Sequence, residues 1–416
     1  MFRLLFISNS NMLNFRRLTF LFFSVTTVFL LLIGCINYVV DPYGLYRKVD
    51  LNGFNQQKEG VRSKIRFVKA LELPLRKPKT IILGSSRVHE AINPDDIELS
   101  DQQYSPAYNL GIDMLRIHEA AEYLQFAVNN SDIKRVIFGL DFFMFNSIQQ
   151  SEANFDPSLI SARPSAFQYL KSTLISGSAF SDSMRTLKQS NSQTTRREFL
   201  SNGYRPAPMV FFGLSDYTAL HYYTNYTFLS PTSNTKYYGE FSLNKKVFLD
   251  FEKILKICKE RQIDLRMYIS PAHADLEGEG IRATGNWILF ESWKRKLVDL
   301  SDQYDYPMWD FSGYNSITTE PVKTPMKNYW DSSHFDERIG HLILKRIFRN
   351  DSGVPTDFGV LLRKENIDSE LLKIRVQRSS YELSSPQRID NLQKGFQRIL
   401  GGEPLDQSIV ENMFSN

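Results

Sequence analysis

Two short segments that lie far apart in the sequence carry the side chains able to do chemistry in this chain. In Tyr-Trp-Asp-Ser-Ser-His-Phe, residues 329–335, Asp331 and His334 stand three positions apart. Near the other end, a Gly-Ser-Ser-Arg segment that contains Ser86 directly follows Thr-Ile-Ile-Leu, a run typical of a short buried strand. A serine hydroxyl becomes a useful nucleophile when a histidine takes its proton, and a carboxylate can hold that histidine in the right tautomer. We therefore predict a catalytic triad of Ser86, His334 and Asp331, with acyl transfer or ester hydrolysis as its chemistry.

Neither segment identifies a catalytic site by itself. Gly-Ser-Ser after a strand is usually only a turn, and Asp-x-x-His is common in loops that cap helices. The combination is more specific, because each segment stands next to a predicted strand end, where open α/β sheets bind their ligands.

The elements that must position these residues alternate between strands and helices. Apolar runs predict strands at residues 79–83, 108–110, 135–140, 265–269 and 307–310. Helical periodicity predicts helices at residues 114–128, 243–261, 287–304 and 338–348. Such alternation is typical of βαβ units, so we predict an α/β fold with a parallel sheet.

Residues 147–236 break this rhythm, since they are rich in Ser, Asn, Thr and aromatic residues. We expect an insertion that covers the active face as a lid or substrate platform, partly helical around 166–174 and 183–188. A lipase or peptidase would call for a large apolar lid, whereas this segment is polar and aromatic.

The segment from Leu18 to Val40 contains no charged residue and is long enough to cross a bilayer as a helix. Arg16 and Arg17 directly precede it, which favours a cytoplasmic N-terminus and an exported main domain. We predict an uncleaved single-pass membrane anchor.

Other interpretations of this apolar segment stay open. A cleaved signal peptide would need a small-x-small site, which does not follow it. The residues Leu32-Ile33-Gly34-Cys35 match a bacterial lipoprotein processing box, although apolar residues continue to Val40. The flanking arginines and the length argue against a buried helix of a soluble core.

Composition narrows the remaining function classes. The formal net charge of +4 and the lack of a dense Lys/Arg run do not indicate nucleic-acid binding. The two cysteines, Cys35 and Cys258, show no zinc-ligand spacing and are not expected to form a disulfide. We predict neither a metal nor a cofactor.

Four blocks of the chain resemble those of the SGNH (GDSL-like) hydrolase superfamily. They are Gly84-Ser85-Ser86, Asn109-Leu110-Gly111, Gly139-Leu140-Asp141 and Asp331-Ser332-Ser333-His334. The resemblance covers residues 79 to about 349, interrupted by the insertion. It implies a flavodoxin-like three-layer parallel sheet and an oxyanion and substrate site that includes Asn109, Gly111 and Asp141. To this site we add Arg87, which could bind an anionic substrate, and His273, which follows the fourth predicted strand.

More narrowly, the chain is similar to the membrane-anchored branch of that superfamily. The shared features are the anchor followed by Asp-Pro-Tyr-Gly, Gly-Ser-Ser-Arg in place of Gly-Asp-Ser, and a late Trp-Asp-x-x-His-Phe. That branch includes alginate O-acetyltransferase proteins and the D-alanyl transfer protein of teichoic acid synthesis. The resemblance implies acyl transfer to a cell-surface or exported glycan, a polytopic membrane acyltransferase as partner, and the bacterial inner membrane as location.

Two departures from the family pattern affect the proposed chemistry. Asp141 stands where the family has an asparagine that donates to the oxyanion, and an ionised carboxylate can only accept. Ser85 replaces the usual acidic residue before the nucleophile. Loss of one oxyanion donor typically costs about a hundred- to a thousandfold in rate. A non-catalytic, polysaccharide-binding scaffold on a degenerate SGNH fold is therefore the alternative.

The predicted organisation has five parts along the chain. They are a cytoplasmic N-terminus (1–17), the anchor (18–40), a polar connector (41–78), the catalytic domain (79–349, with the insertion at 147–236) and a charged, helical C-terminal tail (350–416).

Overall fold

A computed structural model describes residues 9–148, 155, 157, 160, 166–191, 199–206, 240–322 and 326–401. The chain forms two compact units. The smaller unit combines Met1–Lys64 with Pro164–Thr195, and the larger combines Ile65–Arg163 with Arg196–Asn416. The predicted connector is therefore divided between the two units.

A six-stranded, mostly parallel sheet forms the centre of the larger unit, in the order β2-β1-β3-β4-β5-β6. Its strands are β1 (Thr80–Gly84), β2 (Ala107–Gly111), β3 (Arg135–Leu140), β4 (Asp264–Ile269), β5 (Met308–Asp310) and β6 (Val360–Leu362). The first five strands pair in parallel, and β6 pairs antiparallel with β5. The predicted α/β class is confirmed, and the five predicted strands agree with β1 to β5 to within one residue. We did not predict β6, because its three residues are too few to show a period.

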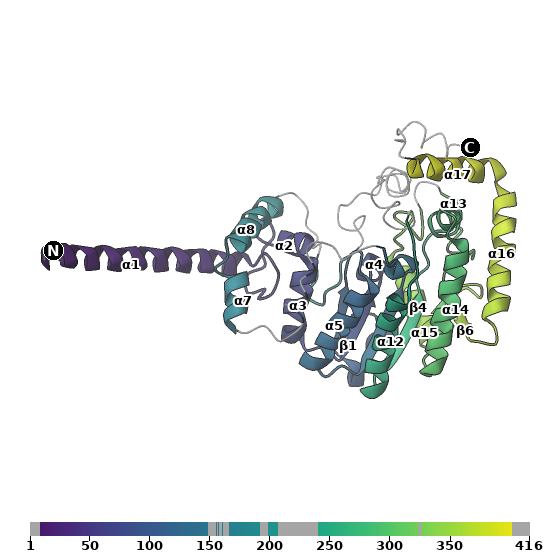
Figure 1. Cartoon of the computed structure of the whole chain (residues 1–416), viewed down its shortest axis with the longest axis horizontal. Helices are drawn as coiled ribbons and strands as arrows, with labels where there is room; N and C mark the ends of the chain where they lie inside the picture. Colours follow the sequence, from purple (N-terminus) through teal and green to yellow (C-terminus); the bar gives the residue numbers. More distant parts are fainter. Residues whose placement is uncertain are drawn as a thin grey trace, which may run out of the picture. The chain divides into compact units, whose positions relative to one another are not determined.

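Helices cover the sheet (Figure 1). They are α3 (Ile65–Arg76), α4 (Ser86–Ala91), α5 (Ile117–Asn130), α12 (Lys245–Glu260), α14 (Trp287–Gln303) and α15 (Glu337–Ile347). Two further helices, α16 (Ile367–Ser384) and α17 (Pro386–Leu400), pack outside them, α16 on α14 and α17 on η6. The four predicted helices correspond to α5, α12, α14 and α15, with ends within three residues. The tail contains the two helices α16 and α17, and α3 lies in what we predicted to be a polar connector.

Short helical turns complete the larger unit. They are η1 (Ile97–Leu99), η2 (Gln102–Tyr104), η3 (Phe142–Phe145), the π-helical turn η6 (Asp275–Gly280) and α13 (Ile281–Ala283).

Successive strand residues enter two separate hydrophobic clusters. Ile81 and Leu83 of β1 belong to a cluster that also contains buried residues of α5, α12 and α14. Ile82, between them, belongs to a second cluster with buried residues of α4 and α15. Both faces of the sheet are thus covered by helices, as parallel sheets require.

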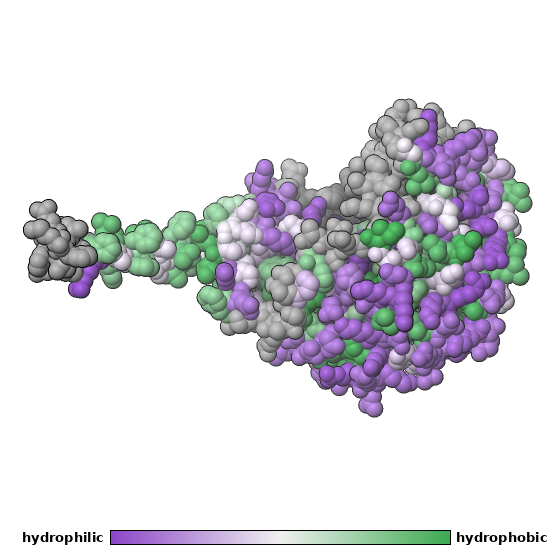
Figure 2. All heavy atoms as spheres, viewed as in Figure 1, coloured by the Kyte–Doolittle hydropathy of each residue, from purple (hydrophilic) through white to green (hydrophobic). Residues whose placement is uncertain are grey.

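The smaller unit contains α1 (Asn9–Val40), α2 (Glu59–Ser63), α7 (Ala166–Thr173) and α8 (Gly177–Ser190). Within α1, Phe15–Val40 is long and apolar enough to cross a membrane, and its most apolar window is not buried by the rest of the chain. Figure 2 shows this helix with a largely hydrophobic surface.

The helices predicted within the insertion are present as α7 and α8, and they fold with the N-terminal segment in the smaller unit. The Asn37 side chain of α1 donates to the carbonyl oxygen of Leu174 at 2.6 Å. Most of the remaining insertion, including residues 207–239, lies outside the described residues. Residues 166–191 thus pack with α1 in the smaller unit. The lid over the active face stays a prediction.

Close packing between α15 and α4 depends on Gly340. A Cβ added there would lie 1.9 Å from the carbonyl oxygen of Ala91, at the end of α4. We expect Gly340→Ala to lower the free energy of unfolding by about 3 kcal/mol, the upper end for overpacking. Thermal unfolding of the full chain in detergent measures this change. Gly177→Ala is the control, because a Cβ there meets no atom within 4 Å. Equal stability of both variants would contradict the tight α4–α15 contact.

Candidate active site

Ser86 lies at a sharp turn where β1 passes into α4. A Cβ on Gly84 would come within 2.4 Å of Val88 Cγ2 and 2.9 Å of the Gly139 carbonyl oxygen, so the turn requires glycine. Ser85 is the N-cap of α4, and its Oγ accepts the Arg87 N–H at 3.2 Å. Ser86 is the first residue of the helix and is partly exposed, whereas Ser85 and Arg87 are buried.

His334 and Asp331 lie in the loop before α15, and His334 contacts Ser86 at the carboxyl end of β1. One oxygen of Asp331, Oδ1, accepts the backbone N–H groups of Ser333 at 2.6 Å and His334 at 2.7 Å. The other, Oδ2, is 2.7 Å from His334 Nδ1. His334 Nε2 is 2.8 Å from Ser86 Oγ. With its Nδ1 proton directed to Asp331, His334 can accept the Ser86 proton on Nε2. The structure thus brings the three predicted triad residues together.

The surroundings of His334 favour its charged form. The Trp330 ring stacks on the imidazole, with centroids 4.7 Å apart and an angle of 14° between the planes. Burial lowers the pKa of His334, but the carboxylates of Asp331 and Glu90 outweigh it, so the pKa is raised above the ordinary histidine value. An imidazolium formed by proton transfer from Ser86 would be stabilised in the same way.

Gly111 and Asn109, the predicted oxyanion block, bind each other. The Gly111 N–H donates to Asn109 Oδ1 at 2.8 Å. The Asn109 amide donates to the carbonyl oxygens of Val88 at 3.0 Å and Ile92 at 2.8 Å. Asn109 is fully buried and fixes the helix that carries Ser86. The Gly111 N–H is therefore occupied and does not face an open oxyanion position.

The backbone N–H of Ser86 remains as a donor beside its own hydroxyl, the candidate nucleophile. It is the first N–H of α4 and has no partner within the helix. Within the described part of the chain it has no acceptor elsewhere either.

Asp141 does not act as a donor, because its carboxylate holds Arg87. Asp141 Oδ2 accepts the Ser85 hydroxyl at 2.5 Å, and Oδ1 accepts Arg87 NH1 at 2.7 Å. Arg87 Nε also donates to Ser333 Oγ at 3.2 Å. Arg87 is 2% exposed and Asp141 0%. Arg87 is thus neither an exposed helix-start residue nor free to bind an anionic substrate, and it links the loops after β1 and β3 to the triad loop.

Two buried carboxyl groups near the triad were missed by sequence reasoning. Glu90 lies one helical turn after Ser86, and its Oε1 accepts Arg205 NH1 at 2.7 Å. Burial raises the pKa of Glu90 to about 7. Its four-residue spacing from the nucleophile, on a segment that begins a helix, is the sequence signal that could have identified it.

The second carboxyl group is Glu277 in η6. Its Oε1 lies 3.7 Å from Arg87 NH1, and burial raises its pKa to about 7. The C-terminal helix α17 holds this turn, since Arg388 NH1 pairs with Asp275 at 2.6 Å. A π-helical turn next to a candidate active site is a recurrent feature of functional sites. No local pattern in the sequence marks it.

His273 contacts the loop that carries Asp331 and His334. It is fully buried, its Nε2 is 2.8 Å from the Glu320 carbonyl oxygen, and its Nδ1 accepts the Asp275 N–H at 3.2 Å. Burial lowers its pKa and so disfavours the charged form of the ring. Its backbone N–H donates to the Ser332 carbonyl oxygen at 3.1 Å. These contacts indicate that His273 holds neighbouring loops of the site in position.

No protein-family model matches this chain, and no curated protein matches its sequence. Among the residues that the structure describes, no group of three or more His, Cys, Asp or Glu side chains is arranged to hold a metal ion.

The raised pKa of His334 predicts a shifted pH profile for the reactivity of Ser86. Labelling of Ser86 by a fluorophosphonate needs neutral His334, so its rate should rise with pH through a value above the ordinary 6.5 or so. Glu90→Gln removes one of the charges that raise this pKa and should move the rise to lower pH. Mass spectrometry of the labelled chain at a series of pH values measures the profile. The exposed Glu365→Gln serves as control, and identical profiles for both variants would contradict the influence of Glu90.

Asp141→Asn tests whether Asp141 holds Arg87 or serves the oxyanion. The asparagine restores the residue typical of the SGNH pattern but leaves the buried Arg87 charge without its carboxylate. We expect a loss of about 3 kcal/mol in the free energy of unfolding and slower labelling of Ser86. Asp132→Asn, at a carboxylate 71% exposed, should change neither quantity. Faster labelling by Asp141→Asn would instead indicate that position 141 donates to the oxyanion.

Proposed function

We propose that the chain is a membrane-anchored serine acyl-transfer enzyme or esterase of the SGNH type, which acts outside the cytoplasm. The observation that carries this proposal is the pair of contacts made by His334. Its Nε2 is 2.8 Å from Ser86 Oγ while its Nδ1 is 2.7 Å from Asp331. Both distances are within the range of hydrogen bonds, and Ser86 is the partly exposed member of the three.

The geometry supports a two-step acyl transfer. Ser86 Oγ attacks the acyl carbonyl carbon while His334 Nε2 takes the hydroxyl proton. The bond between that carbon and the leaving oxygen then breaks, and His334 returns the proton to the leaving oxygen. In the second step, water or a sugar hydroxyl attacks the acyl-serine and loses its proton to His334, which finally reprotonates Ser86. Asp331 stabilises the imidazolium in both steps.

The arrangement of the sheet supports the SGNH assignment. The order of the first five strands, 2-1-3-4-5, is that of flavodoxin-like sheets, which bind ligands at the carboxyl ends of their strands. Ser86 follows the carboxyl end of β1 and Asp141 that of β3. The glycan acceptor, the polytopic acyltransferase partner and the bacterial inner membrane, with the main domain on the periplasmic side, are proposed from the resemblance of the motifs.

A second candidate function is a non-catalytic scaffold that binds polysaccharide. The observation in its favour is that both predicted oxyanion groups are engaged elsewhere: the Gly111 N–H with Asn109, and Asp141 with Arg87. Stabilisation of the oxyanion would then depend on the Ser86 N–H. Since such donors contribute about a hundred- to a thousandfold each, the turnover of this site would be slow.

The proposal is tested with the full chain in detergent and p-nitrophenyl acetate as acyl donor. Ser86→Ala and His334→Gln should each lower nitrophenol release by about a thousandfold, because nucleophile and base act as a unit. His341→Gln is the control, since His341 lies on α15, is partly exposed and pairs with Asp96. Mass spectrometry should find the acetyl group on Ser86 in the parent chain. Equal release from all variants and no acetyl-serine would favour the scaffold.

A further inference from the structure

If α1 crosses a bilayer, its length sets the depth at which its last residues lie. The twenty residues from Leu18 to Asn37 span about 30 Å as a helix, the thickness of the hydrocarbon core. Asn37 therefore lies at the outer boundary of that core when Leu18 lies at the inner one. A polar side chain at this depth needs partners, and Asn37 has two. Its Nδ2 donates to the Leu174 carbonyl oxygen at 2.6 Å, and its Oδ1 accepts the Ser183 hydroxyl at 2.8 Å.

These contacts place the turn between α7 and α8 at the same boundary. A second contact agrees, because a Cβ on Gly34 would lie 3.8 Å from Ile175 Cγ2. Gly34 is one helical turn further into the core than Asn37. The turn thus lies beside the last part of the predicted membrane segment, within the same compact unit.

The turn and the helix before it expose large apolar side chains. Phe167 is 69% exposed, Leu170 47% and Ile175 39%. Phe167 and Leu170 are three residues apart on α7 and so share one side of that helix. Exposed apolar residues gathered at this depth are unfavourable in water and favourable among lipid acyl chains.

Three tyrosines lie together near the end of α1 and on α7. The ring centroids of Tyr38 and Tyr46 are 5.0 Å apart, and those of Tyr46 and Tyr169 are 6.3 Å apart. Tyr46 Oη lies 3.3 Å from Thr173 Oγ1, at the end of α7. Tyrosine is enriched where membranes meet water, because its ring is apolar and its hydroxyl is polar.

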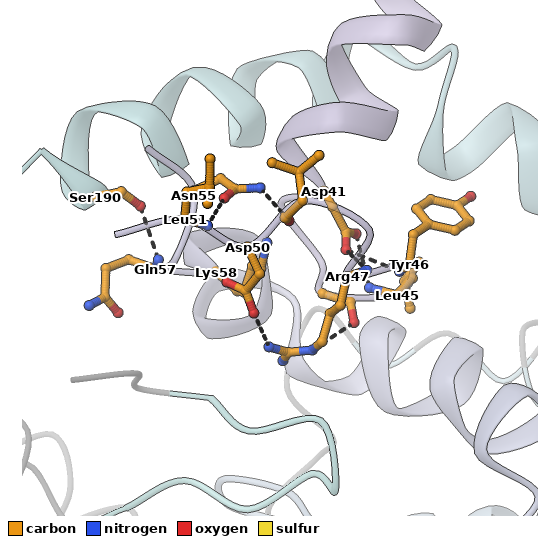
Figure 3. Close-up of polar contacts among 12 residues, drawn as sticks. Asp41, Leu45, Tyr46, Arg47, Asp50, Leu51, Asn55, Gln57, Lys58 and Ser190 are labelled. Carbon is orange, nitrogen blue, oxygen red and sulfur yellow. Dashed lines mark hydrogen bonds and ion pairs between the residues drawn. The ribbon is translucent and has the colours of Figure 1, made fainter. Parts of the chain in front are cut away.

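Hydrogen bonds order the loop that follows α1. The Asp41 carboxylate accepts the N–H groups of Leu45, Tyr46 and Arg47, as Figure 3 shows. The Asn55 amide donates to the carbonyl oxygens of Val39 and Val40. Because these bonds come from buried or half-buried groups, the chain after α1 is a defined structure and not a loose linker.

The charge of this part of the unit suits an anionic surface. Residues 41–64 and 166–191 contain eight Lys and Arg against four Asp and Glu. Lys171, Arg185 and Lys188, all on α7 or α8, are exposed. Basic residues next to a membrane helix are attracted to anionic lipid headgroups.

We propose that α7 and the α7–α8 turn form a membrane-contact surface, with Phe167, Leu170 and Ile175 at the headgroup and acyl-chain boundary of an anionic bilayer. This inference rests on the proposed role of α1 as the anchor, but not on the catalytic proposal. The part of the insertion formed by 166–191 would then hold the smaller unit against the bilayer instead of covering the substrate.

The experiment measures lipid exposure by spin labelling of the full chain in nanodiscs with anionic lipid. Cys35→Ser is the background, and Cys258 is retained, since burial raises the pKa of its thiol to about 12 and keeps it unreactive. A nitroxide is attached separately at Phe167→Cys, Phe20→Cys and Leu249→Cys. Phe20, on α1, is the lipid control, and Leu249, 50% exposed on α12, is the aqueous control. Collision rates with oxygen and with a water-soluble nickel complex are compared, and circular dichroism checks folding.

We expect the Phe167→Cys label to collide more with oxygen than with nickel, as at Phe20→Cys, while the Leu249→Cys label shows the reverse. A nickel preference at Phe167→Cys together with an oxygen preference at Phe20→Cys would overturn the contact surface and leave the anchor intact. A nickel preference at Phe20→Cys would overturn the anchor and this inference with it. Protection of Phe167→Cys from both reagents would show a protein cover, such as a second copy, and would also overturn the lipid contact.

Discussion

The buried ion pair between Arg87 and Asp141 is the interaction on which the geometry of the candidate site depends. A guanidinium that is 2% exposed is tolerable only with a matching charge and further hydrogen bonds. Asp141 supplies the charge, and Ser333 Oγ accepts from Nε. Since these residues follow β1, follow β3 and lie in the triad loop, the pair fixes three segments at once. The 2.8 Å contact between Ser86 and His334 follows from that arrangement.

The same arrangement uses groups that an SGNH-type site would direct at the substrate. Asn109 is bonded to the end of α4 and to the Gly111 N–H, so it stabilises the helix that carries Ser86. Asp141 accepts from Ser85 and Arg87, where the family pattern has a donor. The site is therefore well ordered for proton transfer between Ser86 and His334, and less well supplied with donors for an oxyanion. Fewer donors for an oxyanion would slow the proposed chemistry, whether water or a sugar hydroxyl accepts the acyl group.

The smaller unit shows how an insertion can pack with the apolar helix α1. Asp182 of α8 accepts the Tyr43 hydroxyl at 2.8 Å and pairs with Lys64 at 2.6 Å, so residues from both parts of the sequence share one buried carboxylate. Near the end of α1, Asn37 is bonded to Leu174 and Ser183, whereas the carbonyl oxygens of Val39 and Val40 accept from Asn55 in the following loop. Exposed apolar residues on α7 then lie where a bilayer can cover them.

The sequence by itself determined the α/β class, the limits of the main strands and helices, the apolar α1 and the residue types of the candidate triad. These features are local. A period of two or 3.6 residues shows which face of one strand or helix is buried, and a long uncharged run marks an apolar helix. Only the tertiary structure decided that Ser86 meets His334, 248 positions away, and that Arg87 is buried against Asp141. It also decided that β6 joins the sheet and that 166–191 packs on α1. The partner of a charge, a short edge strand or an inserted helix is chosen by contacts between distant segments, and no local period records them.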